Sequence, residues 1–129
     1  MAILTEAIKK AIGNMGVFPI ATASATGVPN LVYVGCLRVL DNDTIQIADN
    51  KFCKTRQNLD ENPVLTVTLW YPDCERCYQL KGNVTLITEG DVYDDCVEWV
   101  HGAINADLTP KAAVNLIVTE VYSGSERLA

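Results

Sequence analysis

Residues 45–63 read IQIADNKFCKTRQNLDENP. Two isoleucines alternate with polar residues at the start, which predicts a strand over residues 44–48. Residues 54–62 are polar and rich in good helix formers, and they end at Asn62 because a residue before proline is disfavoured in the helical region. The segment therefore predicts a strand, a loop and a short helix in that order.

The start of this helix is a candidate phosphate site. The first turn of a helix points unpaired N–H groups outward, and the helix dipole favours an anion there. Lys54 adds a positive charge, Thr55 adds a hydroxyl donor, and upstream Asp49 and Asn50 could face a planar heterocycle. The alternative stays open, since a Lys-Thr pair at a helix start commonly serves only as a cap and a solvated charge.

Apolar periodicity predicts the other elements. A helix is expected over residues 4–13, closed by Gly13, and another over residues 91–106. Strands are expected over residues 17–23, 31–40, 64–70, 78–89 (bent at Gly82) and 113–122. The first three strands should form an antiparallel meander. Six strands and three helices with short connections favour a small closed or split barrel over a βαβ sheet.

Length and composition set further limits. With 129 residues, the chain is expected to form a single domain over residues 1–129. Its net charge of −6 argues against a nucleic-acid binder, which needs a basic face. The sequence has no apolar run long enough for a membrane span and no signal-peptide pattern. Five cysteines without a disulfide pattern then indicate reduced thiols and a cytoplasmic protein.

The segment also resembles a known family. Residues 47–63 are similar to the strand–loop–helix of the pyridoxamine 5'-phosphate oxidase family, the FMN-binding split barrels. Ala48-Asp49-Asn50 falls on an aromatic-Thr-Asn type triplet, and Cys53-Lys54-Thr55 falls on the Ser-Arg-Lys type segment that grips the FMN phosphate. The order of parts agrees over roughly residues 4–122, and the likeness is closest to the short FMN-binding proteins of the family.

This resemblance implies a mainly β (α+β) fold, a six-stranded antiparallel split β-barrel with Greek-key character and short flanking helices. It also implies FMN binding at the interface of a homodimer, with Trp70, Tyr78 and Leu80 as candidates either for the wall that faces the partner or for the core. Lys54 and Thr55 would hold the phosphate, and Asn58 would support it. The implied cofactor-binding residues are Tyr33, Val34, Gly35, Cys36, Ala48, Asp49, Asn50, Lys54, Thr55 and Asn58; Ala48 to Asn50 would meet the ring edge through backbone groups.

The chain departs from the full-length oxidases at two places. Residues 31–35 replace their Arg-x-Val-Leu-Leu-Lys strand, and the C-terminus lacks the Arg and His that bind the pyridoxine ring. We therefore expect an FMN-dependent oxidoreductase or electron-transfer protein with an unidentified redox partner or small-molecule substrate, and not a pyridoxamine phosphate oxidase. No catalytic acid or base stands in a recognisable arrangement.

Two alternatives remain. The same barrel could bind haem or F420, and haem would need an axial ligand from His101 or a cysteine. The Cys74-Glu75-Arg76-Cys77 spacing suits a redox dithiol or two of four zinc ligands, although the sequence offers no second pair and no metal site is expected. Cys53 is either a reactive thiol near the phosphate or a small residue in a family position. Trp70 and Trp99 are expected in the core, and the alternative for either is stacking on the flavin.

Overall fold

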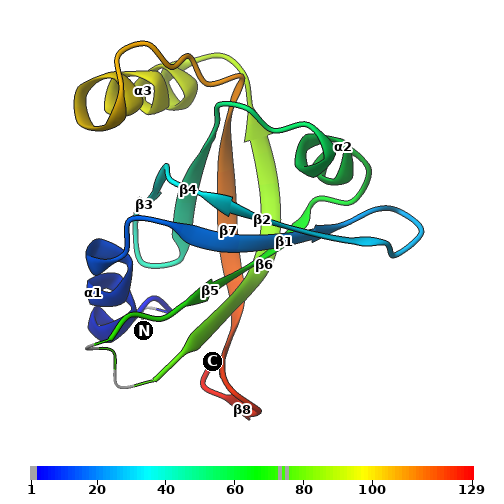
Figure 1. Cartoon of the computed structure of the whole chain (residues 1–129), viewed down its shortest axis with the longest axis vertical. Helices are drawn as coiled ribbons and strands as arrows, with labels where there is room; N and C mark the ends of the chain where they lie inside the picture. The colour runs from blue at the N-terminus through cyan, green and yellow to red at the C-terminus, as the bar shows by residue number, and fades with distance from the viewer. Residues whose placement is uncertain (1–2, 73, 75) are drawn as a thin grey trace.

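The computed structural model describes residues 3–72, 74 and 76–129. The described strands form one antiparallel sheet in the order β2-β1-β5-β6-β7-β4-β3, with β8 paired to β7 (Figure 1). They are β1 (Phe18–Ala23), β2 (Pro29–Val34), β3 (Leu37–Val39), β4 (Thr44–Asp49), β5 (Val64–Leu69), β6 (Tyr78–Ile87), β7 (Ala112–Ser123) and β8 (Glu126–Arg127). β1 pairs with β5 as well as with its chain neighbour β2, which gives the Greek-key character that was expected.

The second predicted strand is broken in two. Gly35 and Cys36 separate β2 from β3; β2 pairs with β1, whereas β3 pairs with β4. The antiparallel pairings of the expected meander are present as β1–β2 and β3–β4, but the continuous strand over residues 31–40 that would join them is wrong. Because β2 and β3 are consecutive in the chain and lie at opposite ends of the strand order, the sheet curls round into a split barrel. The six expected strands are present if β2 and β3 count as one, and β8 is additional.

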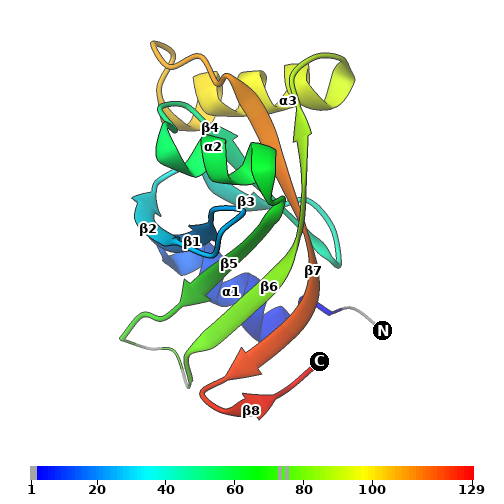
Figure 2. The same cartoon turned by 90° about the vertical axis from the view of Figure 1, so that its right-hand side faces the viewer.

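Three helices flank the sheet as predicted: α1 (Glu6–Asn14), α2 (Lys54–Glu61) and α3 (Asp91–Trp99), which continues as a π-helix, η1 (Val100–Ile104). α1 runs one residue past Gly13, which was expected to close it. It buries Ile8 and Ile12 in the main core. Figure 2 shows α2 and α3 at one end of the sheet and β8 at the other. The end that carries α2 and α3 also carries a cavity of 650 Å³.

The bend expected at Gly82 corresponds to a shift of register between β6 and β7 after Lys81. A Cβ atom on Gly82 would overlap the Ile117 carbonyl oxygen and lie 2.7 Å from the carbonyl carbon. Only glycine allows the two backbones to approach this closely. In the part of the chain that the structure describes, no helix is both long and apolar enough to cross a membrane.

Candidate functional site

A cavity of 650 Å³ lies between β2, the end of β4, the loop over residues 50–53 and the start of α2. Eight of the ten residues predicted from the sequence line it: Tyr33, Val34, Gly35, Cys36, Ala48, Asn50, Lys54 and Thr55. The break between β2 and β3 brings the first four to the β4–α2 loop that carries the others. The two remaining predicted residues, Asp49 and Asn58, are buried outside the lining.

One end of the cavity is suited to an anion. Lys54 is the first residue of α2, and the side chain of the N-cap residue Cys53 makes no capping hydrogen bond, so the first-turn N–H groups remain available to a ligand. Thr55 is only 3% exposed, and its hydroxyl oxygen accepts a hydrogen bond from Asn30 Nδ2 at 3.1 Å. The Thr55 hydroxyl proton is then free to be donated into the cavity.

The other walls are largely apolar, with one buried thiol. Asn50 Nδ2 donates a hydrogen bond to Cys36 Sγ at 3.2 Å. Burial raises the pKa of the Cys36 thiol, and the hydrogen bond from Asn50 opposes this only in part. Cys36 is therefore a neutral thiol at pH 7. Asn50 Oδ1 is buried and has no hydrogen-bond partner among the described residues, which fits a ligand that brings its own donor.

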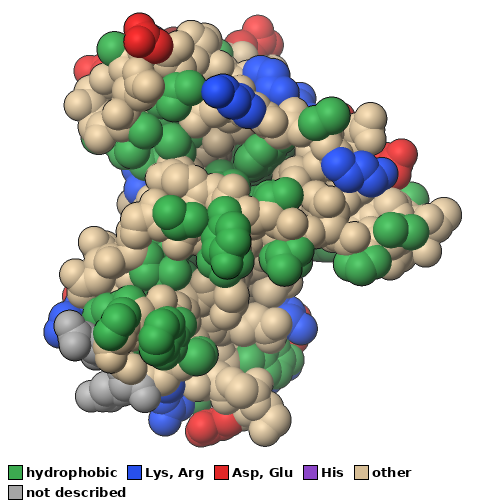
Figure 3. Space-filling view, in the orientation of Figure 1, with side chains coloured by type: hydrophobic (Ala, Val, Ile, Leu, Met, Phe, Trp, Pro, Cys, Tyr) green, Lys and Arg blue, Asp and Glu red, His purple; other side chains and the backbone are tan. Residues whose placement is uncertain are grey.

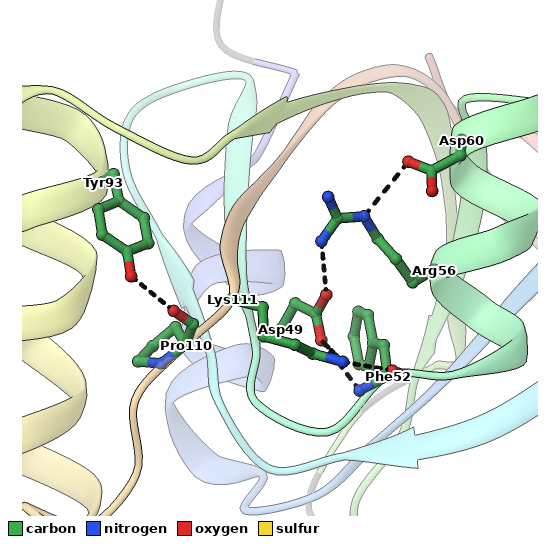
Figure 4. A network of polar contacts seen from close by, with 7 residues as sticks. All are labelled: Asp49, Phe52, Arg56, Asp60, Tyr93, Pro110 and Lys111. Atoms are coloured by element: carbon green, nitrogen blue, oxygen red, sulfur yellow. Dashed lines mark hydrogen bonds and ion pairs between the residues drawn. The ribbon is translucent and has the colours of Figure 1, made fainter.

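Asp49 lies behind this cavity at the end of β4, and its side chain is 0% exposed. Its carboxylate accepts the Phe52 N–H at 2.9 Å and pairs with Arg56 Nη1 at 3.0 Å and Lys111 Nζ at 3.8 Å (Figure 4). Its carbonyl oxygen accepts the Lys111 N–H at 2.6 Å. Burial acts to lower the pKa of Arg56, but the bonds to Asp49 and Asp60 outweigh it and raise that pKa.

Asn58 lies on α2 and is fully buried. Its Nδ2 donates to Thr22 Oγ1 at 3.0 Å, which ties the helix to β1, and its Oδ1 has no hydrogen-bond partner in the described part of the chain. The side chain thus supports the helix that carries the anion site, and its predicted link to the phosphate stays a prediction.

A sequence model of the pyridoxamine 5'-phosphate oxidase family matches residues 4–123. The chain belongs to this family. An uncharacterized protein of Methanocaldococcus jannaschii is 41% identical to it over 123 residues, which cover 93% of this chain and 80% of the relative. The pattern of residues 45–63 was thus a correct guide to the family.

Solved structures share the fold. HupZ of Group A Streptococcus superposes with a TM-score of 0.85 at 25% identity, over 98% of this chain and 99% of that one. An FMN-binding protein of Syntrophomonas wolfei superposes with a TM-score of 0.71 at 17% identity, over 89% of this chain and 81% of that one. HutZ, a haem storage protein of Vibrio cholerae, superposes with a TM-score of 0.70 at 12% identity, over 93% of this chain and 94% of that one. Proteins with this fold therefore carry more than one kind of cofactor.

Seven further residues line the cavity and were not among the ten predicted cofactor-binding residues, although Cys53 had been considered as a thiol near the phosphate: Asn30, Val32, Lys51, Phe52, Cys53, Ile104 and Leu108. Asn30 and Val32 extend the predicted wall on β2, and Lys51 to Cys53 complete the loop before α2. Ile104 and Leu108 come from the end of η1 and the segment after it. A family motif around residue 50 carries no signal for residues so distant in sequence.

The structure decides between the alternatives for the aromatic residues only in part. Trp70 was a candidate for the core or the partner wall, and it is 56% exposed, so the core assignment is wrong. Trp99 packs half-buried against the second core cluster, beneath the Arg38 guanidinium, which lies 4.5 Å from its ring centroid. Tyr78 and Leu80, for which the core was the alternative to the partner wall, belong to the main core.

The thiol pair lies away from the cavity, on the β5–β6 connection. Cys74 Sγ donates to the Arg76 carbonyl at 2.8 Å, and Cys77 is an exposed free thiol. Within residues 3–72, 74 and 76–129, no three His, Cys, Asp or Glu side chains gather as a metal site would require. His101 is exposed on η1 and does not line the cavity.

Proposed function

We propose that this member of the pyridoxamine 5'-phosphate oxidase family is an FMN-binding flavoprotein that acts as an oxidoreductase or an electron carrier. The observation that carries the proposal is the joining of an anion site at Lys54 and Thr55 to an apolar cavity of 650 Å³. That volume lies within the range of about 300–1,000 Å³ found for ligand pockets. A molecule with a phosphate at one end and a planar ring at the other matches this division.

The donor set supports the same ligand. Lys54, the Thr55 hydroxyl and the N-terminal N–H groups of α2 would hold the phosphate, and Val32, Val34 and Leu108 would exclude water from the ring. Bound FMN supplies the hydride or electron chemistry. The described lining contains no carboxylate and no imidazole, and its titratable side chains are those of Tyr33, Cys36, Lys51, Cys53 and Lys54. Electron or hydride transfer with protons taken from solvent fits such a cavity best.

Two features argue against oxidation of pyridoxamine phosphate. Residues 31–35 place no cation on the wall of the cavity, where the full-length oxidases carry Arg and Lys. Arg127, near the C-terminus, donates to the Ala129 carbonyl at 2.9 Å and pairs with Glu120 at 3.6 Å on the strand pair β7–β8. It does not line the cavity, and the described lining contains no arginine.

We also propose a homodimer that completes the site. Leu31 and Tyr33 on β2 are 71% and 76% exposed, and Tyr33 also lines the cavity. Figure 3 shows many hydrophobic side chains open to solvent across the face drawn there. A second copy on β2 would cover these side chains and the open side of the ligand. The five free cysteines suit the reducing cytoplasm, which we propose as the compartment.

The first test is a visible spectrum of the purified protein and a titration with FMN. A flavin spectrum, or tight binding of added FMN, supports the proposal; a protein that stays colourless with FMN refutes it. A Soret band, or binding of F420 in place of FMN, would assign the alternative cofactor. Sedimentation of the FMN-loaded protein tests the dimer, and a loaded monomer would contradict it.

The second test is Lys54→Ala. Loss of one charge-assisted hydrogen bond to the phosphate should weaken FMN binding by about 10- to 100-fold. Lys10→Ala on α1, an exposed lysine away from the cavity, is the matched control and should bind FMN as the native chain does. Equal affinities of native chain and Lys54→Ala would remove Lys54 from the site.

A further inference from the structure

Asp49 is a buried carboxylate that touches no open part of the cavity, yet its contacts converge on the anion site. Both backbone hydrogen-bonding groups of Phe52, its N–H and its carbonyl oxygen, take part in these contacts. Asp49 accepts the Phe52 N–H at 2.9 Å, and Lys111 Nζ, itself 3.8 Å from the Asp49 carboxylate, donates to the Phe52 carbonyl at 2.6 Å. The loop is thereby fixed one residue before Cys53, the N-cap of α2.

The same carboxylate also reaches into the helix. Arg56 lies in the first turn of α2, and its guanidinium bonds Asp49 at 3.0 Å on one side and Asp60 at 3.3 Å on the other (Figure 4). Asp49 therefore restrains the chain both before and after Lys54 and Thr55. These two residues lie between the clamped Phe52 peptide and the clamped Arg56 side chain.

The positively charged side chains near the site fall into two groups, those paired with Asp49 and those that line the cavity. Arg56 and Lys111 are paired with Asp49. Lys51 and Lys54 line the cavity, and neither has a carboxylate within ion-pair distance in the described part of the chain. A buried charge is costly unless it is paired and hydrogen-bonded, so a carboxylate kept here needs these partners. Its partners belong to the loop, the helix and the segment that leads into β7.

We propose that Asp49 is the positioning residue of the phosphate end. Its carboxylate orients Lys54, Thr55 and the N-terminal N–H groups of α2 through Phe52 and Arg56, without touching the ligand. The inference rests on the proposed FMN function. It predicts a selective effect: removal of the charge weakens the grip on the phosphate and leaves binding of the ring unchanged. A residue that only stabilised the fold would weaken both.

The experiment compares Asp49→Asn with the native chain in titrations with FMN and with riboflavin, which lacks the phosphate. Asparagine keeps the shape but loses the charge that holds Arg56 and Lys111. The FMN dissociation constant should rise by about tenfold or more, while that of riboflavin stays within about twofold. Asp60→Asn, which removes the exposed partner of Arg56, is the matched control and should leave both constants within about twofold.

Amide hydrogen exchange of Phe52 supplies a measurement that needs no ligand. The Phe52 N–H should exchange slowly in the native chain and faster in Asp49→Asn, while the amides of β6 and β7 keep their protection. If Asp49→Asn does not fold, Arg56→Gln replaces it, because it removes one arm of the same clamp and should show the same selective loss of FMN.

The outcomes separate the two proposals. Equal losses for FMN and riboflavin, or an unchanged FMN constant, would overturn the role of Asp49. So would a Phe52 amide that exchanges equally fast in the native chain and in Asp49→Asn. A native chain that binds neither flavin refutes the FMN function itself, whatever the exchange of Phe52 shows.

Discussion

Gly82→Ala tests the close contact between β6 and β7. The added Cβ would overlap the Ile117 carbonyl oxygen, and it would lie 2.7 Å from the carbonyl carbon and 3.0 Å from Val118 Cα. All three atoms belong to the backbone, so no side-chain rotation can relieve the overlap, and the two strands must separate locally. Overpacking of this kind costs about 1–3 kcal/mol, and we expect about 3 kcal/mol because the obstacle is rigid.

The assay is urea unfolding followed by tryptophan fluorescence, with the slope compared between variants. Gly102→Ala on η1 is the matched control, because a Cβ there meets nothing within 4 Å. That substitution should leave the free energy of unfolding unchanged or raise it by up to about 1 kcal/mol. A Gly82→Ala protein within about 0.5 kcal/mol of the native chain would show that the strands adjust freely and would refute the reasoning.

Two further predictions concern single ionisable groups. The Asp43 and Thr44 N–H groups bond the Asp41 carboxylate and lower its pKa below the ordinary 3.8. The carboxylate therefore stabilises the fold above pH 3.8, and this stabilisation is lost as the pH falls through the folded pKa. Urea unfolding between about pH 5 and 2 should show the loss, and Asp41→Asn should lack it. Burial raises the pKa of Cys36, so iodoacetamide should alkylate this thiol more slowly than the exposed thiols of Cys53 and Cys77, and bound FMN should slow the alkylation of Cys36 further. A time course of peptide masses measures the three alkylation rates, and equal rates would contradict the prediction.

The elements with strong local signals were predicted closely. The helix expected over residues 54–62 is α2 (Lys54–Glu61), since Pro63 limits its end in any context. The break between β2 and β3 was missed because residues 31–40 are rich in Val and Leu on both sides of Gly35. Periodicity shows which side chains can be buried, but it does not show that each half pairs with a different strand.

Trp70 illustrates a second limit. An aromatic residue at the end of a β-rich run was assigned to the core, yet Leu69 is buried and Trp70 is exposed. Buried residues alternate along β5 and end with Leu69, the last residue of the strand, and Trp70 follows as the next, exposed position. A single sequence gives no sign of which face is covered. That depends on the curl of the whole sheet.

The cavity also has residues that could be predicted from the sequence and residues that could not. Its predicted members lie in two short segments, and the family resemblance located them because each segment is continuous in sequence. Ile104, Leu108 and Lys111 reach the site only through the return of the chain from α3 into β7. Lys111 bonds a residue 59 positions away. Contacts of this length depend on topology, and a single sequence does not encode them in any local pattern.

Asp49 connects the fold to the proposed function. The sequence singled it out as a contact to the ring edge through backbone groups, and that contact stays a prediction. Its side-chain carboxylate is turned into the protein and bonded to Phe52, Arg56 and Lys111. A substitution at any of these four positions changes the surroundings of the others, so the effects of substitutions at two of them should not be additive. The residues that would touch the ligand are only part of the anion site. The loop and helix that present them are bonded to the buried Asp49 carboxylate, which lies outside the lining of the cavity.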